Sequence, residues 1–263
     1  MTRPKKSLGQ NFLIDQNIID KIINTAEIEG NNIVEIGPGS GNLTKKIIEK
    51  KPNNLLLIEK DRDLFENLKK KFISSKNISI FNDDILDFDL EKNLNKDSVI
   101  LGNLPYNISS QILVKLIKFK NWLPQYKKLV LMFQKEVADK ILSEHNTKNY
   151  GRLTVIAKCR LKIIDHFNVS RHCFYPKPKV ESTVLVFKPI INHDYKVREI
   201  KNLEHITHIF FSNKRKMINK AFNKIFKNPN KISSRYNIDL KWRPSQLSEK
   251  MYYKITSCLE NEK

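Results

Sequence analysis

The sequence predicts an α/β protein: one domain built on a mostly parallel sheet, followed by a small all-α C-terminal domain. Short apolar runs of strand length alternate with segments whose apolar residues recur at helical spacing. This alternation is typical of a parallel sheet covered by helices on both faces. After about residue 190, the strand-length runs give way to lysine-rich amphipathic helices. We therefore expect domains at residues 1–190 and 191–263.

The first domain is expected to contain strands and helices in regular order. Unbroken apolar runs predict strands at residues 31–36, 55–58, 78–81, 98–101 and 129–133. Helices are expected to start near Leu43 and Leu64 and to span residues 109–119. In such an arrangement the carboxyl ends of the parallel strands meet at one edge of the sheet, where open α/β sheets bind ligands.

The later part of the chain carries weaker signals. Residues 152–158 are expected to be helical, although Thr154-Val155-Ile156 would also suit a strand. Strands are expected at 162–169 and 183–187, on either side of a Pro-rich stretch from Phe174 to Lys179. In the second domain, apolar residues at helical spacing predict helices around residues 206–210, 217–225 and 251–259.

The charge of the chain indicates a polyanionic partner. The 263 residues include 48 Lys and Arg against 28 Asp and Glu, a formal net charge of +20. Cationic contacts to phosphates release condensed counterions, so such an excess is typical of proteins that bind nucleic acid. The alternative is that the positive charge has no function and only reflects a composition rich in Lys, Asn and Ile throughout the chain.

No sequence feature predicts a membrane protein, a secreted protein or a metal site. The longest apolar runs are of strand length, well short of the roughly 20 residues that cross a bilayer. Residues 1–8 are basic but lead into no apolar signal core, so we expect a cytoplasmic protein. Neither a disulfide framework nor a zinc site fits the spacing of the three cysteines, Cys159, Cys173 and Cys258. Because no heptad seam demands an oligomer, we expect a monomer.

A Gly-rich segment from Gly37 to Gly41 is the first candidate binding element. The chain has seven glycines, and Gly37, Gly39 and Gly41 fall within five residues, directly after the first predicted strand. Residues without side chains let the backbone turn tightly and approach a ligand closely. The spacing differs from the dinucleotide pattern G-x-G-x-x-G, because here the third glycine follows the second by two residues.

Acidic residues end the next two predicted strands. Glu59 stands 22 residues after Gly37, where an acid commonly accepts hydrogen bonds from ribose hydroxyls, although a solvated acid at a strand end is the alternative. Asp84 has the position and chemistry to meet an adenine amino group, and Asp83 beside it is its rival for that role. Three elements that can bind a ligand thus follow three successive strands.

The tetrapeptide Asn103-Leu104-Pro105-Tyr106 follows the fourth predicted strand and Gly102. An adenine N6 is a poor nucleophile because its lone pair is delocalised into the ring. The Asn103 carboxamide oxygen and the Leu104 carbonyl can both accept hydrogen bonds from that amino group and turn its lone pair toward a methyl donor. Pro105 fixes φ and has no competing N–H, and Tyr106 offers a face for stacking on an extruded base. The tetrapeptide therefore predicts methylation of an adenine amino group.

With these motifs in view, the chain resembles the small-subunit (16S) ribosomal RNA adenine-N6 dimethyltransferases over nearly its whole length. The opening residues Lys5 to Leu13, the tetrapeptide at Asn103 and the stretch Phe174 to Ser182 carry the resemblance, together with Phe211 to Lys216 and Arg243 to Leu247. The resemblance implies a Rossmann-like class I methyltransferase domain with a mostly parallel seven-stranded sheet and a small all-α C-terminal domain that contacts RNA.

The resemblance also implies roles for individual residues. S-adenosyl-L-methionine would be the methyl donor, with no metal. Asn11 and Leu13 would line the methionine and adenine ends of its site. The residues that complete this site would be Gly37, Glu59, Asp84 and Asn103. Phe174 would cover the target base opposite Tyr106.

The implied reaction is dimethylation of N6 on two adjacent adenosines near the 3′ end of 16S ribosomal RNA, in a pre-30S particle. Among enzymes, a large-subunit ribosomal RNA methyltransferase is the runner-up, opposed by Leu8-Gly9, Leu104 and the stretch Arg243 to Leu247. A DNA adenine methyltransferase would leave the N-terminal and C-terminal patterns unexplained. A ribosome-assembly or RNA-binding factor with a vestigial site is opposed by the intact glycine loop, Glu59 and Asn103 to Tyr106.

Overall fold

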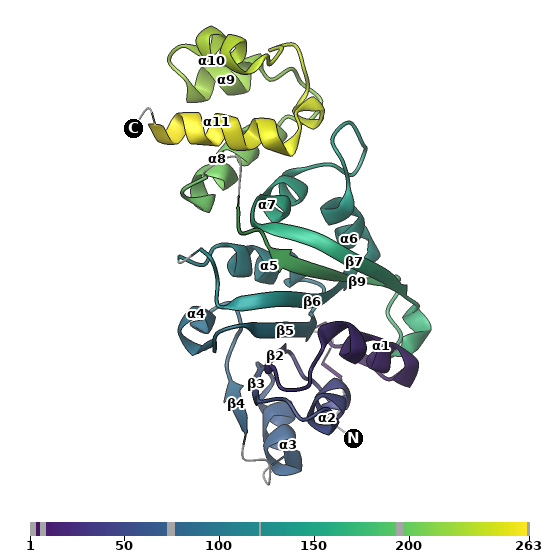
Figure 1. Cartoon of the computed structure of the whole chain (residues 1–263). Coiled ribbons are helices and arrows are strands. Elements are labelled where there is room, and N and C mark those ends of the chain that lie inside the picture. Colours follow the sequence, from purple (N-terminus) through teal and green to yellow (C-terminus); the bar gives the residue numbers. More distant parts are fainter. Residues whose placement is uncertain (1–3, 6–8, 73–76, 121, 193–196, 262–263) are drawn as a thin grey trace. The chain divides into compact units, whose positions relative to one another are not determined.

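The computed structural model describes residues 4–5, 9–72, 77–120, 122–192 and 197–261. It forms two compact units, shown within the whole chain in Figure 1. The first unit comprises residues 1–138 and 162–189, and the second comprises residues 139–161 and 190–263. The change of unit after residue 189 lies next to the predicted division at 190/191, but residues 139–161 group with the second unit. They do so because α7 (Arg152–Arg160) packs against helices of that unit.

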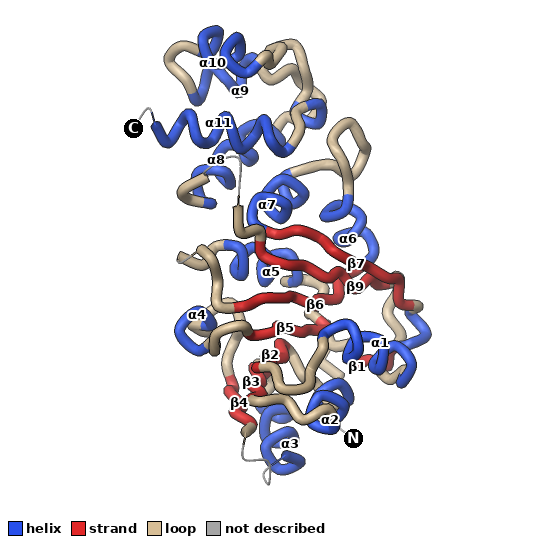
Figure 2. The backbone as a smooth tube through the Cα atoms, in the orientation of Figure 1, coloured by secondary structure: helices blue, strands red, loops and turns tan. Residues whose placement is uncertain are grey.

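A seven-stranded sheet forms the centre of the first unit (Figure 2). Its strand order is β4-β3-β2-β5-β6-β9-β7. The strands are β2 (Asn32–Ile36), β3 (Asn54–Glu59), β4 (Ile78–Asn82), β5 (Ser98–Asn103), β6 (Tyr126–Gln134), β7 (Leu161–Val169) and β9 (Ser182–Pro189). The pairs from β4 to β6 are parallel, and β9 runs antiparallel to β6. The mostly parallel sheet of seven strands is therefore confirmed.

Helices connect the parallel strands, as the alternating pattern predicts. They are α2 (Asn42–Glu49), α3 (Arg62–Phe72), α4 (Leu90–Asn93) and α5 (Ser109–Ile117), and α6 (Lys135–Leu142) follows the last of these strands, β6. Apolar side chains of α2, α3 and α5 are buried, and the polar side chains of α3 are exposed.

Before residue 150, two helices of eight or more residues in the described chain were not predicted, α6 (Lys135–Leu142) and the longer α1 (Gln16–Ala26). Asp15 caps its first turn, because the carboxylate accepts a hydrogen bond of 3.0 Å from the Ile18 N–H. Buried apolar residues then recur along one face, at Ile19, Ile22, Ile23 and Ala26. The cap and this spacing are sufficient signals for a helix, so α1 could have been predicted from the sequence.

Two very short strands form a separate ribbon. β1 (Phe12–Leu13) and β8 (Phe174–Tyr175) pair antiparallel, with Phe12 opposite Tyr175 and Leu13 opposite Phe174. A hydrogen bond of 2.8 Å from the Ile14 N–H to the Cys173 carbonyl extends the ladder. The ribbon joins the N-terminal segment to the Pro-rich stretch. Strands of two residues are too short to show an alternation in the sequence, so this pairing was not predicted.

In the described part of the second unit, helices joined by loops are the regular secondary structure, apart from Leu161, the first residue of β7. After α7 follow α8 (Ile200–Phe211), α9 (Asn219–Ile225), α10 (Pro229–Tyr236) and α11 (Glu249–Asn261). Its core is aromatic, with ring contacts among Tyr150, Phe210, Phe211, Phe222 and Tyr252. Only α10 was not predicted, because it is eight residues long and buries few apolar side chains. The all-α character of this part of the chain is thus confirmed.

Candidate active site

A cavity of about 260 Å³ opens at the carboxyl ends of the parallel strands. It is lined by the N-terminal segment, the glycine loop after β2, the ends of β3 and β5, and the residues after β4. The structure brings together at its wall nine of the ten residues named from the sequence: Asn11, Leu13, Gly37, Glu59, Asp84, Asn103, Leu104, Pro105 and Tyr106. Phe174 is the tenth, and it does not line the cavity.

The glycine loop adopts a backbone conformation that side chains disfavour. Gly37, Gly39 and Gly41 have φ values of 69°, 57° and 78°, in the left-handed region. At Gly39 there is a second restriction, because a Cβ atom would lie 2.9 Å from the ring of Phe12. Phe12 therefore closes over bare backbone at Gly39, beside the cavity.

Glu59 supports this loop from the end of β3. Its carboxylate accepts hydrogen bonds from the Gly39 N–H at 3.0 Å and from the Asp61 N–H at 2.9 Å. The residue is 5% exposed. Burial raises the pKa of Glu59, and the two backbone hydrogen bonds counteract part of that rise. Each oxygen keeps a second lone pair that a ligand hydroxyl could use.

Glu35, in β2, is a buried acid whose individual role the sequence analysis did not consider. Its carboxylate accepts a hydrogen bond of 2.6 Å from the Thr44 hydroxyl. Burial raises the pKa of Glu35 to about 8, and the nearby Glu59 carboxyl adds to the rise. The signal was available, because an acid inside the apolar run Ile33 to Ile36 is unusual for a buried strand.

Asp84 forms an ion pair at the wall of the cavity. Its carboxylate accepts hydrogen bonds from the Lys60 ammonium at 2.6 Å and the Leu86 N–H at 2.9 Å. Partial burial works to raise the pKa of Asp84, but these two donors outweigh burial and hold it below its usual value. Asp83 lines the same cavity, and its carboxylate accepts the Asp84 N–H at 2.7 Å.

Asn103 is oriented by the N-terminal segment. Its Nδ2 donates a hydrogen bond of 2.8 Å to the Asn11 carbonyl, across 92 positions of sequence. With the amide nitrogen held there, Oδ1 is the free end of the carboxamide, and within the described residues no hydrogen bond is directed at it. The Leu104 side chain is buried, and a Cβ at Gly102 would collide with it at 2.6 Å. The Leu104 backbone is thus held at the end of β5.

Tyr106 is tied to the first residue of β9. Its hydroxyl and that of Ser182 lie 2.7 Å apart and share a hydrogen bond. Burial raises the pKa of Tyr106, and the hydrogen bond with Ser182 counteracts part of that rise. This contact joins the tetrapeptide to the end of the Pro-rich stretch.

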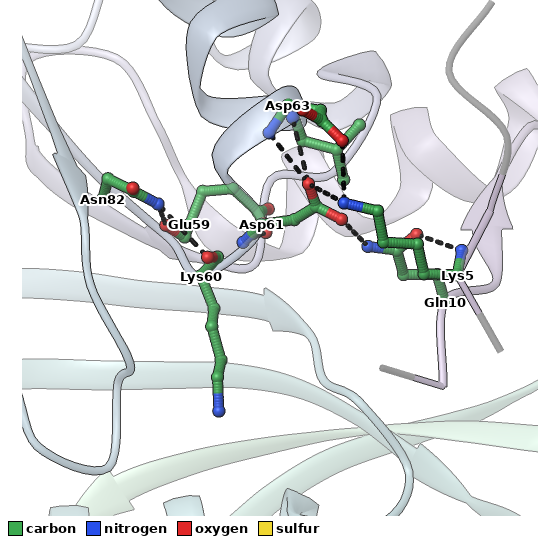
Figure 3. A network of polar contacts seen from close by, with 8 residues as sticks. Lys5, Gln10, Glu59, Lys60, Asp61, Asp63 and Asn82 are labelled. Atoms are coloured by element: carbon green, nitrogen blue, oxygen red, sulfur yellow. Dashed lines mark hydrogen bonds and ion pairs between the residues drawn. The ribbon is translucent and has the colours of Figure 1, made fainter. Parts of the chain in front are cut away.

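The N-terminal segment is fastened to the start of α3 by Asp61 (Figure 3). Asp61 Oδ2 accepts a hydrogen bond of 3.0 Å from Gln10 Nε2, and Asp61 Oδ1 accepts one of 3.0 Å from Lys5 Nζ. The ammonium of Lys5 also reaches Asp63 at 2.8 Å. Within the predicted opening motif Lys5 to Leu13, residues 6–8 lie outside the described residues. We call the Asp61 contacts with Gln10 and Lys5 the clasp.

Phe174 faces the core, unlike its neighbour Tyr175. The Phe174 side chain is 3% exposed and belongs to the apolar core cluster that also contains Leu13. In the structure, therefore, its ring has no open face toward the cavity, and its role against a target base stays a prediction. Tyr175, which the sequence analysis passed over, is 62% exposed.

The basic stretch from Phe211 to Lys216 lies at the end of one helix and in the turn that follows it. α8 ends at Phe211, and residues 212–215 form the turn after it. Lys214 donates hydrogen bonds to the carbonyls of Lys148 at 2.8 Å and Tyr150 at 2.7 Å, so this cation helps to hold the second unit together. In the other predicted stretch, Pro244 to Gln246 form a short 3-10 turn before α11.

The fold and the site define the class of this protein. A sheet in this order, with β9 antiparallel beside β6 and a ligand cavity at the carboxyl ends of its parallel strands, is that of a Rossmann-like class I methyltransferase. Comparisons with known proteins identify the family. The sequence model of the family described as "Ribosomal RNA adenine dimethylase" matches residues 1–261. The chain belongs to this family, as the sequence predicted.

Relatives along the whole chain support the assignment. The chain is 44% identical over 259 residues to "Ribosomal RNA small subunit methyltransferase A" of Pelagibacter ubique (strain HTCC1062), covering 98% of each protein. It is 38% identical to the protein of the same name from Malacoplasma penetrans (strain HF-2), covering 95% of this chain and 90% of the relative.

Solved structures agree with the fold. A dimethyladenosine transferase from Plasmodium falciparum superposes with a TM-score of 0.78 at 27% identity, covering 93% of this chain and 95% of the other. The 23S rRNA methyltransferase ErmE superposes with a TM-score of 0.68 at 22% identity, covering 95% and 100% of the two chains. At that identity, the likeness to ErmE shows the fold alone.

Proposed function

We propose that this chain uses S-adenosyl-L-methionine to dimethylate N6 of two adjacent adenosines near the 3′ end of 16S ribosomal RNA, during biogenesis of the small ribosomal subunit. The observation that carries the proposal is the orientation of Asn103. Its amide nitrogen is occupied by the Asn11 carbonyl, which leaves Oδ1 to accept a hydrogen bond from an adenine amino group. The family and its small-subunit relatives supply the substrate class.

The cavity fits the methyl donor. At Gly37 no atom lies within 4 Å of the position that a Cβ would take, so a ligand can approach the backbone there, and Glu59 and Asp84 present carboxylates beyond neighbouring strands as acceptors for hydroxyl and amino groups. When bound, S-adenosyl-L-methionine supplies an electrophilic methyl group on a sulfonium centre. In our proposal Gly37, Glu59 and Asp84 hold this cofactor, and Asn11 and Leu13 line its methionine and adenine ends.

The residues of the tetrapeptide act on the adenine. In the first transfer, Asn103 Oδ1 and the Leu104 carbonyl accept hydrogen bonds from the two N–H groups of N6, so the nitrogen becomes more tetrahedral and its lone pair is exposed for attack. Pro105 keeps the turn rigid, and the ring of Tyr106 holds the extruded base by stacking. A strong general base is unnecessary, because N6 carries a positive charge directly after it takes the methyl group and then releases a proton readily. In the family pattern Phe174 covers the other side of the base, which requires its ring to leave the core position seen here.

The proposed partners follow from charge and family. A net charge of +20 suits RNA, and we assign RNA contacts to both domains, at residues 1–190 and 191–263. A pre-30S particle in the cytoplasm is the proposed substrate, bound by a monomer that uses no metal. Within the described chain no helix is long and apolar enough to traverse a bilayer, and no cluster of three or more His, Cys, Asp and Glu side chains could hold a metal ion.

Tritium transfer from labelled S-adenosyl-L-methionine tests the proposal. Unmethylated small subunits, large subunits and DNA are offered in parallel, and primer extension maps the product in cells with and without the gene. We expect label in small subunits, at two neighbouring adenosines of 16S ribosomal RNA. Label in large subunits instead would identify the runner-up activity, and no label in any substrate would indicate an assembly factor without catalysis.

A further inference from the structure

The ribbon formed by β1 and β8 has one buried face and one exposed face. Residues directly opposite each other on two antiparallel strands project to the same side, and successive residues alternate. Leu13 and Phe174 are such a pair, and both are buried in the core. Phe12 and Tyr175 are the other pair, so they project to the opposite side of the ribbon.

This opposite side borders the active-site cavity. Phe12 lines the cavity and lies against Gly39, and Tyr175 stands beside Phe12 with 62% of its surface exposed. Ile14 continues the ladder past Leu13 and is 48% exposed. By alternation Ile14 projects to the side of Phe12, which places it diagonally across from Tyr175. We call Phe12, Ile14 and Tyr175 the platform.

Basic residues lie on both sides of Tyr175 in the sequence. Arg171, Lys177 and Lys179 are exposed, and Glu181 is the one acid between Arg171 and Ser182. Glu181 accepts the Arg171 N–H at 2.9 Å and lies 3.9 Å from its guanidinium. The stretch ends at Ser182, whose hydroxyl contacts Tyr106 of the tetrapeptide. The platform is therefore linked to the residues proposed to receive the target adenine.

An exposed ring flanked by cations, beside a site for an extruded base, has the chemistry of a single-stranded RNA site. Bases stack on aromatic faces, and cations contact the backbone phosphates on either side. We propose that Tyr175 stacks on the RNA base next to the target adenosine and so holds the strand while its neighbour is in the cavity. This inference deepens the proposed function and rests on it.

Kinetics of Tyr175 variants test the stacking. Initial rates of tritium transfer are measured against the concentration of unmethylated small subunits for wild type, Tyr175→Phe, Tyr175→Leu and Tyr175→Ala. Base stacking on an aromatic side chain is worth about 1–3 kcal/mol, which corresponds to about 5- to 150-fold in affinity. We expect the KM for small subunits to rise by that factor in the Leu and Ala variants and to stay within about twofold in the Phe variant.

Controls separate stacking from damage to the fold. Calorimetric titration should give an unchanged Kd for S-adenosyl-L-methionine in every variant, because Tyr175 does not line the cavity. The matched control is Ile164→Ala, at an exposed apolar residue of the edge strand β7, and its KM should equal that of wild type.

Several outcomes would overturn the inference. If the Ala variant has the KM of wild type, Tyr175 does not contribute to substrate binding. If the Leu variant has that KM, an apolar contact is enough and the ring does not stack on a base. Absence of transfer by wild type would refute the proposed function, and this inference with it. If wild type transfers methyl groups and the variants have an unchanged KM, the stacking by Tyr175 is refuted and the proposed function stands.

Discussion

The clasp predicts that a residue outside the reaction centre controls cofactor binding. Gln10 donates to Oδ2 of Asp61, and Asp61 is 4% exposed. A hydrogen bond to a charged group contributes about 1.5–3 kcal/mol where it is buried. Gln10 itself is half-buried, so we expect the loss of this hydrogen bond to cost about 1–2 kcal/mol. Because residues 9–13 line the cavity, Gln10→Ala should raise the Kd for S-adenosyl-L-methionine by about 5- to 30-fold.

A reciprocal exchange tests the bond itself. Gln10→Glu places two carboxylates face to face and should weaken cofactor binding at least as much as Gln10→Ala. Adding Asp61→Asn should restore affinity, because the asparagine amide can donate to Glu at position 10. The carboxamide oxygen of the asparagine at position 61 can still accept the hydrogen bonds from the Asp63 and Leu64 N–H groups that Asp61 Oδ1 accepts now, at 2.9 and 3.4 Å.

Isothermal titration with S-adenosyl-L-methionine is the assay. Gln16→Ala is the matched control, since Gln16 lies on the same stretch, is exposed and makes only a 3.4 Å contact with the Ile14 carbonyl. The reasoning is refuted if Gln10→Ala and Gln10→Glu bind within twofold of wild type. It is also refuted if the double variant binds no better than Gln10→Glu, because the loss would then not come from this bond.

Three further predictions concern the cavity. Asn103→Ala should lower kcat about 100-fold or more while the Kd for S-adenosyl-L-methionine rises by less than about fivefold, as measured by single-turnover transfer and calorimetry. Gly39→Ala should weaken cofactor binding, because the backbone there has a φ of 57° and an added Cβ would lie 2.9 Å from the Phe12 ring and force that ring away. Ser40→Ala is the control. The pKa of about 8 at Glu35 lies above its unfolded value of about 4.3, so its contribution to stability is complete below about pH 4 and is lost as the pH rises through about 8. Without cofactor, Glu35→Gln should therefore lose less Tm than wild type between about pH 5 and pH 9, and parallel melting curves would contradict this.

Local patterns were sufficient for most of the strands and helices. The helix at 152–158, for which a strand was the alternative, is confirmed as α7, and the apolar runs became the parallel strands. α1 was missed although its cap at Asp15 and its apolar spacing are local signals. β1 and β8 could not be found in this way, since two residues are too few to show an alternation.

The sequence by itself determined the class of fold, and it predicted the place of the site at the strand ends and the chemistry of Asn103 to Tyr106, because each depends on a short contiguous pattern. Only the tertiary structure decided which side chains meet. It turned Phe174 into the core and Tyr175 outward, and it joined Asn103 to Asn11. It also joined Gln10 to Asp61. The physical reason is that the direction of a side chain depends on the partner of its strand, and that partner comes from a segment distant in sequence.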